Sequence, residues 1–361
     1  MGATADHKFT PIGVFDEYTD SSKPELGIVD DSKYFLGVFD GNNKKIDNIH
    51  EQSVGGTGLF ACISTGAAIK NLGIGENSII EGGDGTGSLV GNMKGGIIEN
   101  CYNEGLVTGI GGSFGTGGLI GVGEYGKITN CYNTGMVKGV SDVGGIVGYV
   151  DKNFTIDNCY NCGMINASGL FVGGLVGLMY AGTITNSYNI GMISDGPLFV
   201  NAIVGATDMD PFVIKNCYYS KELTNIGEEI TNGISEKSVE EMKAASFITL
   251  LNGGQNPIAW TADTRNINGG FPILVWQSSP VTGIQNASEK TDCNIYVVDK
   301  SIVVECSENV PCQMNVINLN GKIINSQTFL KNNSLNITDS GIYIVTVNIN
   351  SQQYTSKVVI K

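Results

Sequence analysis

The sequence predicts an all-β protein, in which a parallel β-solenoid of about seven coils is followed by a short helical cap and a small β-sandwich. We expect the solenoid, or β-helix, to be right-handed. Three observations predict this fold. One unit recurs throughout the region 1–220, each unit holds three strand-length apolar runs separated by glycine, and the region 293–361 alternates with period two. The predicted boundaries are 1–220 for the solenoid, 221–277 for the cap, 278–292 for a linker and 293–361 for the sandwich.

Composition excludes several classes of protein. Glycine accounts for 51 of 361 residues and proline for only 8, which indicates regular turns rather than disorder or collagen. The net charge of −14 leaves no basic surface for binding nucleic acid. No apolar run approaches the ~20 residues of a transmembrane helix. No apolar leader follows Met1, which does not by itself place the protein in the cytoplasm.

The repeat is clearest in an Asn-Cys-Tyr-Asn motif, as in TNCYNTGMVKG at 129–139. Its first Asn returns at nearly regular intervals, at Asn48, Asn71, Asn100, Asn130, Asn158, Asn186 and Asn216. A glycine motif of the form GGLVG precedes it and ends at Gly91, Gly121, Gly148, Gly177 and Gly205. In a parallel solenoid each strand pairs with its copy in the next coil, so equivalent residues stack about 4.8 Å apart.

Stacking of equivalent residues explains why polar residues recur, so no catalytic or metal-binding role is needed to account for them. An Asn amide both donates to and accepts from its copies, so we expect a structural stack of Asn71, Asn100, Asn130, Asn158, Asn186 and Asn216. Cys101, Cys131, Cys159 and Cys217 share one position, which Ser187 takes in another unit. Thiolates spread along a line cannot converge on a metal, and the two histidines, His7 and His50, lie before them. The sequence predicts no catalytic residue, metal or cofactor.

Beyond residue 220 the repeat decays. Ser238 and Glu241 have the spacing of a capping box, and the apolar run that follows ends at Gly253, so we expect a single helix of about twelve residues. The region 263–277 has the pattern of an extended segment with apolar anchors. Helix and segment together are expected to cover the open end of the solenoid, where unpaired strand edges invite aggregation.

The region 293–361 contains six or seven short alternating strands, which predict a small sandwich. Asn320-Gly321 follows one of these strands as a hairpin turn. Cys306 and Cys312 are close enough in sequence for a disulfide if the protein is exported, and the sequence leaves open whether they form one.

Two sets of aromatic residues are candidates for ligand binding. The Tyr row consists of Tyr102, Tyr132, Tyr160, Tyr188 and Tyr218. It offers an aromatic strip for sugars or for a partner's apolar surface if it faces outward, and it is packing if it is covered. Loops before the glycine motifs vary more in sequence, and they carry Phe114, Phe171 and Phe199.

Carboxylates offer a route to enzymology, because β-helices that process polysaccharides need two or three of them on one face. The candidates Asp84, Glu99, Glu124, Asp142, Asp157 and Asp195 mostly occupy different positions of the repeat, which favours solvated turn residues. His50-Glu51 opens like a zinc peptidase helix, but the second His is missing at Val54.

The glycine motifs at 117–121, 144–148 and 173–177 resemble the GLUG repeat. The resemblance extends over residues 9–277 and includes VFDGNNKKIDNI at 38–49 and NGGFPILVWQ at 268–277. It implies a β-solenoid from a large bacterial surface or secreted protein of adhesin type, with no recognised catalytic residue.

Residues 293–361 resemble the C-terminal sorting domain of Bacteroidetes type IX secretion substrates, through INLNGKII at 317–324, GIYIVTV at 341–347 and TSKVVIK at 355–361. That resemblance implies contact with the secretion machinery and a place at the outer-membrane cell surface or outside the cell. The resulting hypothesis is a non-enzymatic, adhesin-like protein that binds host or extracellular-matrix proteins or glycans. The alternatives are a polysaccharide-binding or polysaccharide-processing β-helix and a structural spacer.

Overall fold

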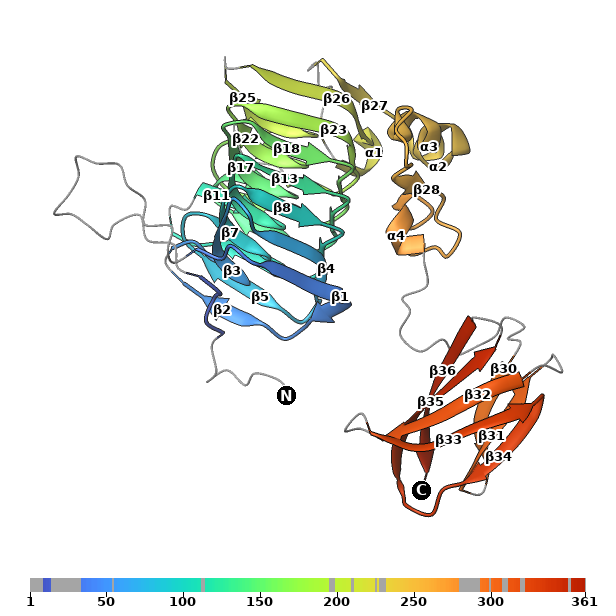
Figure 1. Ribbon diagram of the computed structural model, residues 1–361. Helices are drawn as coiled ribbons and strands as arrows, with labels where there is room; N and C mark the ends of the chain where they lie inside the picture. The colour runs from blue at the N-terminus through green and yellow to red at the C-terminus, as the bar shows by residue number, and fades with distance from the viewer. Residues whose placement is uncertain are drawn as a thin grey trace. The chain divides into compact units, whose positions relative to one another are not determined.

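Figure 1 shows the computed structural model of the protein. It describes residues 9–13, 34–53, 55–111, 114–194, 199–208, 211–224, 226, 232–278, 293–298, 300–306, 311–318, 322–349 and 352–360. The chain divides into two compact units at 279/280. The predicted linker, apart from Ser278, the hairpin turn at 320–321, and residues His7, Val54 and Asp195 lie outside the described residues.

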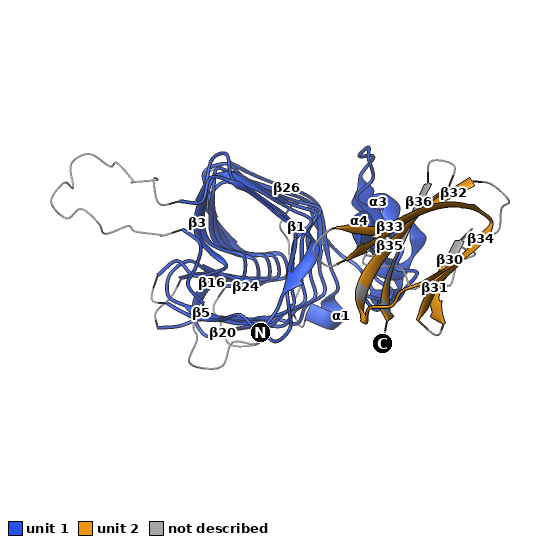
Figure 2. Ribbon diagram, turned by 60° about the horizontal axis from the view of Figure 1, so that its bottom comes forward, with its two compact units in different colours: residues 1–279 blue, residues 280–361 orange. Residues whose placement is uncertain are grey.

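The first unit is a parallel β-solenoid with four strand rows, which we name sheets A to D. Figure 2 shows its coils end-on. Sheet A comprises β3 Phe60–Ser64, β7 Val90–Lys94, β12 Ile120–Glu124, β17 Val147–Asp151, β22 Val176–Met179 and β25 Val204–Thr207. Sheet C comprises β2 His50–Gln52, β5 Ile79–Gly82, β10 Leu106–Gly109, β15 Val137–Gly139 and β20 Ile165–Ala167. Sheet D comprises β6 Thr86–Gly87, β11 Phe114–Gly117, β16 Ser141–Gly144, β21 Val172–Gly173 and β24 Val200–Asn201.

Sheet B carries the Asn-Cys-Tyr-Asn motifs. Its strands are β1 Val38–Ile46, β4 Ala68–Ile74, β8 Gly96–Glu99, β9 Tyr102–Asn103, β13 Gly126–Thr129, β14 Tyr132–Asn133, β18 Phe154–Asp157, β19 Tyr160–Asn161, β23 Gly182–Asn189, β26 Phe212–Tyr219 and β27 Ile234–Glu236. Ile12 and Phe35, which precede β1, already pair with β3. The seven Asn motifs, from the end of β1 to β26, mark seven passes across sheet B that enclose about six turns.

The glycine motif is a tight arch between sheets D and A. A Cβ on Gly117 would lie 2.0 Å from the Ile120 carbonyl oxygen, and one on Gly121 would lie 2.3 Å from the backbone of Gly85 in the previous coil. Only glycine allows this approach of two backbones. The arch is so short that its two strands form one apolar run in the sequence, which is why three runs per unit are predicted and four strand rows are found.

Two apolar layers fill the coils. The larger core holds the Leu or Ile of each arch with the inward residues of sheets A and B, among them Leu119, Ile120 and Ile128. A smaller core between sheets C and D holds Val137, Val143, Ile165, Ala167, Val172 and Ile193.

The cap differs from the prediction in its shape. Its elements are α1 Lys221–Thr224, α2 Val239–Lys243, α3 Ala245–Asn252, β28 Trp260–Thr261, β29 Ile273–Leu274 and α4 Val275–Ser278. The capping box at Ser238 and Glu241 is present, and Gly253 ends α3 in the left-handed conformation. The expected single helix is nevertheless two helices, because Ala244 is extended with ψ 148°.

The cap's position also corrects the prediction. The segment from α2 to α4 lies along the outer side of sheet B instead of across the end of the stack (Figure 1). The apolar side chains of this segment pack against the tyrosines on the outer side of sheet B. The sequence pattern shows that the segment has an apolar face but does not show which part of the solenoid that face contacts.

The second unit is a sandwich of two antiparallel sheets. One contains β30 Cys293–Val298, β31 Ser301–Cys306 and β34 Asn332–Asn336, and the other contains β32 Pro311–Asn318, β33 Ile323–Leu330, β35 Gly341–Ile349 and β36 Gln352–Ile360. Cys306 is disulfide-bonded and Cys312 is not, so the question that the sequence left open is settled against a Cys306–Cys312 bridge. The strand register places Cys293, not Cys312, opposite Cys306.

Candidate functional site

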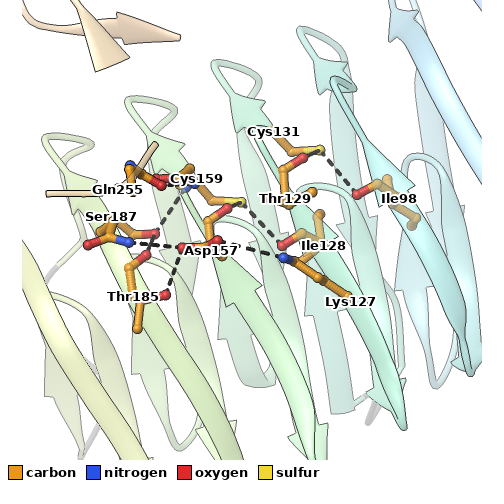
Figure 3. A network of polar contacts seen from close by, with 12 residues as sticks. Ile98, Lys127, Ile128, Thr129, Cys131, Asp157, Cys159, Thr185, Ser187 and Gln255 are labelled. Atoms are coloured by element: carbon orange, nitrogen blue, oxygen red, sulfur yellow. Dashed lines mark hydrogen bonds and ion pairs between the residues drawn. The ribbon is translucent and has the colours of Figure 1, made fainter. Parts of the chain in front are cut away.

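The Cys row is buried in the larger core. Cys101, Cys131, Cys159 and Cys217 are fully buried, and Ser187 takes the same position between Cys159 and Cys217. The Cys131 thiol lies 3.1 Å from the Thr129 carbonyl oxygen, and the Cys159 thiol lies 3.4 Å from that of Asp157. Figure 3 shows the longer contacts of the same two thiols with the Ile98 and Ile128 carbonyls of the previous coil. Burial raises the pKa of Cys131 well above its usual value, so the nucleophilic thiolate is disfavoured. The row is a packing layer.

The first Asn of each motif adopts the left-handed conformation, with φ between 51° and 59°, at Asn48, Asn71, Asn100, Asn130, Asn158, Asn186 and Asn216. Asn tolerates this region better than other non-glycine residues, which adds a reason for its recurrence. The amide of Asn100 donates to Asn71 at 3.1 Å, and that of Asn216 donates to Asn186 at 3.1 Å. Between these two pairs the predicted ladder is interrupted. The side-chain oxygen of Asn130 is buried without a hydrogen-bond partner among the described residues, the Asn158 amide donates to the Gln255 side chain of the cap at 3.2 Å, and the Asn186 amide donates to Asp157 at 3.1 Å.

A second Asn ladder was not predicted. The last Asn of each motif, at Asn103, Asn133, Asn161 and Asn189, is fully buried. Consecutive members bond at 2.8, 2.8 and 2.9 Å, and each Nδ2 also donates to the carbonyl of the glycine two positions on. In the sequence, each of these Asn residues is followed two positions later by Gly, and this constant Asn-x-Gly spacing is the signal from which the second ladder could have been predicted.

The Tyr row stacks along sheet B. Adjacent rings from Tyr102 to Tyr188 lie 5.0, 5.0 and 5.1 Å apart with interplanar angles of 4°, 9° and 7°. The cap covers the row: Trp276 stacks on Tyr102 and Tyr132, Trp260 packs on Tyr160 and Tyr188, and Phe247 meets Tyr188 and Tyr218 edge-on.

Polar contacts fix the cap to this row. The Tyr188 hydroxyl donates to the Pro272 carbonyl at 2.6 Å, and the Gln277 amide donates to the Tyr160 hydroxyl at 2.9 Å. Tyr160, Tyr188 and Tyr218 are at most 7% exposed. An open aromatic strip at these three residues is therefore wrong, because a segment far downstream in the sequence packs against them. Tyr102 and Tyr132 are half-buried beside Trp276.

The loop phenylalanines lie elsewhere, at the start of sheet D. Phe114 is 50% exposed and Phe199 55% exposed. Phe171 and Phe199 stack with their centroids 5.3 Å apart. Phe171 has a φ of 57°, in the left-handed region. At the equivalent position, two earlier coils have Gly85 and Gly115, which also adopt this region. A bulky side chain in that region is strained, and such strain is concentrated at functional positions.

The column that contains Phe171 faces the outer side of sheet A. A Cβ on Gly85 would lie 2.7 Å from the Asn92 amide, and one on Gly115 would lie 2.8 Å from a Val122 methyl group. One coil on, the register places Asp142 after Gly115 and Tyr149 after Val122. Asp142 therefore faces Tyr149.

We name the group around this contact the Tyr149 patch: Glu124, Tyr125, Asp142, Tyr149, Asp151, Lys152 and Tyr180. The Tyr149 and Tyr180 rings lie 5.6 Å apart, and the Lys152 ammonium lies 5.9 Å from the Tyr125 ring centroid. Tyr125 is 59% exposed, and Tyr149 and Tyr180 are half-buried. The patch thus presents one exposed and two half-buried tyrosines together with half-buried Asp151, whereas Glu124 and Asp142 are largely covered.

The two inner carboxylates of the patch differ electrostatically. Burial raises the pKa of Asp142 to about 6. Burial also acts on Glu124, but hydrogen bonds from Lys94 at 2.9 Å and Lys152 at 3.0 Å outweigh it and lower the Glu124 pKa. Burial and then the charge of Asp151 raise the pKa of Tyr149 to about 12, with smaller contributions from Glu124 and Asp142.

The other carboxylates named from sequence have structural contacts. Asp84 accepts the Phe114 N–H at 3.1 Å, Glu99 lies 3.9 Å from Lys70, and Asp157 accepts the Thr185 hydroxyl at 2.7 Å. Across the described ranges, no three His, Cys, Asp or Glu side chains are grouped to hold a metal. No helix within those ranges has the length and hydropathy to cross a bilayer.

Two family models match the chain. The GLUG motif matches residues 112–138, and the secretion system C-terminal sorting domain matches residues 297–361. No curated protein and no solved structure matches it. The GLUG match spans the arch and the Asn-Cys-Tyr-Asn strand of one coil, and the strand register carries the same pattern into its neighbours.

The sorting domain marks the protein for type IX export to the cell surface or the extracellular space. The chain therefore combines a β-solenoid that contains a GLUG motif with a type IX secretion sorting domain at residues 297–361.

Proposed function

We propose that this exported protein is a non-enzymatic, adhesin-like binding protein whose solenoid binds host or extracellular-matrix glycans or proteins through the Tyr149 patch. The observation that carries the proposal is the set of exposed and half-buried tyrosines beside Asp151 along sheet A, whereas the described residues of the cap pack on the Tyr row of sheet B. Tyrosine supplies apolar area with a polar end, and carboxylates accept hydrogen bonds from hydroxyl groups of sugars.

The stacked pair Phe171 and Phe199 extends the same column by two coils. The binding surface thus runs along the coil axis, and equivalent positions repeat about every 4.8 Å. Such a surface suits an extended ligand that contacts several coils.

The test is binding of the full chain to arrays of glycans, mucins and matrix proteins. We expect the double variant Tyr149→Ala/Tyr180→Ala to lose about tenfold or more in affinity, because truncating a central aromatic anchor costs about 1–2 kcal/mol. Tyr296→Ala, at a 39% exposed tyrosine of the sorting domain, is the matched control. Binding that survives the double variant, or no binding to any class of ligand, would contradict the proposal.

Polysaccharide processing is the second candidate. It is favoured by the opposite pKa shifts of Asp142 and Glu124, since glycosidases combine a carboxylic acid of raised pKa with an ionised carboxylate. Release of reducing ends from polysaccharides by the wild type, but not by Asp142→Asn or Glu124→Gln, would favour this candidate over simple binding.

A further inference from the structure

The first coil contains a buried carboxyl group with no hydrogen-bonded side chain or charged group of the described chain to compensate it. Glu51, on β2, is 4% exposed, and neither of its carboxyl oxygens makes a geometrically sound hydrogen bond to a described residue. Burying a carboxylate without a partner is unfavourable, so the group stays neutral or moves toward water.

The position is otherwise apolar. The sheet register aligns Glu51 with Ile80, and the same column continues through fully buried Val107, Val137 and Ile165 in the next coils. Five coils of the solenoid thus show what this position accommodates, and only the first has an ionisable group there.

No charged side chain among the described residues compensates Glu51. His50 and Gln52, on either side of it, point to the opposite face of the strand. Residues 9–13, whose first N–H donates to the His50 carbonyl at 3.1 Å, contain no titratable side chain. The backbone N–H of Gly58 favours the charged form, but burial outweighs it and raises the pKa of Glu51 to about 8.

Glu51 lies on a strand at the edge of sheet C, so the charge of its carboxyl group affects whether that strand stays in place. β2 is the terminal strand of sheet C, so within the described chain it has a strand partner on one side only, namely β5. It is three residues long. A strand held by so few bonds opens at a lower free energy than strands inside the stack.

We propose that Glu51 makes the first coil a pH-sensitive latch: the neutral acid keeps β2 on the solenoid, and loss of its proton to water releases β2 and uncovers the edge of β5. An uncovered strand edge is a template for pairing with another chain. This inference is independent of the proposed binding function.

The direction of the effect follows from linkage. The carboxyl of Glu51 has a pKa of about 8 when β2 is closed, against an ordinary value of 4.5 when it is exposed. Opening is therefore least favoured below pH 4.5, becomes easier by about tenfold per pH unit above it, and levels off above pH 8.

Hydrogen exchange of the full chain, followed by mass spectrometry on peptides covering residues 46–60, tests the latch. After correction for intrinsic rates, the opening constant of the wild type should rise by more than about a hundredfold between pH 5 and pH 8. Glu51→Gln, which keeps the shape without the charge, should abolish the rise, and Glu51→Leu serves as a second neutral variant.

Glu81→Gln is the matched control, because Glu81 lies one coil on and one position along, on the outward face of β5. It should retain the wild-type rise. A wild type whose opening is independent of pH, or a Glu51→Gln variant that keeps the rise, would overturn the proposal.

Discussion

The buried Asn ladder offers the sharpest test of how the coils are held together, and Asn161 lies inside it. Asn161 accepts hydrogen bonds from the Asn133 amide at 2.8 Å and the Gly163 N–H at 3.1 Å. It donates to the Gly163 carbonyl at 3.0 Å and to Asn189 at 2.9 Å. Asn161→Ala removes all four bonds from a site with no exposure to water.

The size of the effect follows from these contacts. At about 0.5–1.5 kcal/mol for each hydrogen bond, four bonds contribute roughly 2–6 kcal/mol. Some partners keep a second bond in the variant. The Asn133 side-chain amide still donates to the Gly135 carbonyl, and the Asn189 side-chain oxygen still accepts from the Gly191 N–H. We therefore expect a loss of about 3–4 kcal/mol in the free energy of unfolding.

Urea denaturation followed by tryptophan fluorescence measures this loss. The chain has only two tryptophans, Trp260 and Trp276, and both pack on the solenoid, so the signal reports on the first unit alone. Asn166→Ala, at an exposed position of the same coil, is the control and should change stability by less than about 0.5 kcal/mol. Equal losses in the two variants would refute the view that the ladder stabilises the stack.

Other substitutions probe the remaining layers. Gly121→Ala should cost about 2–3 kcal/mol by urea denaturation, because its Cβ would lie 2.3 Å from the backbone of the previous coil, whereas Gly55→Ala, with no described atom within 4 Å, should be nearly neutral. Cys131→Ser should cost less than about 2 kcal/mol, since one coil already has serine in that row; a larger loss would show that the position needs sulfur. Trp260→Ala should cost about 3–5 kcal/mol and expose the Tyr row to quenchers in fluorescence measurements; an unchanged Tyr signal would show that the cap is not its cover. The raised pKa of Asp142 implies stability that is full below about pH 4 and falls as pH rises to about 6; Asp142→Asn should remove that fall from the pH profile of the melting temperature, and an unaltered profile would contradict it.

The solenoid can be predicted from the repeat, because each coil contacts the next through equivalent residues. A regular period with an Asn-Cys-Tyr-Asn motif leaves parallel stacking as the arrangement that pairs every copy. The capping box at Ser238 and the glycine stop at Gly253 were also determined locally, since their hydrogen bonds join positions close in sequence. The match of the tail to a sorting domain rests in the same way on contiguous sequence.

Which residues cover the repeat depends on packing between segments that are far apart in the sequence. The Tyr row displays its rings on the outside of sheet B, and whether those rings meet a ligand or packing depends on Trp260 and Trp276, which lie outside any repeat. Asp142 and Tyr149 face one another because an arch folds sheet D against sheet A, and no spacing in the sequence encodes that fold-back. A repeat specifies the contacts of a coil with its copies, whereas contacts between different rows depend on side-chain packing in three dimensions.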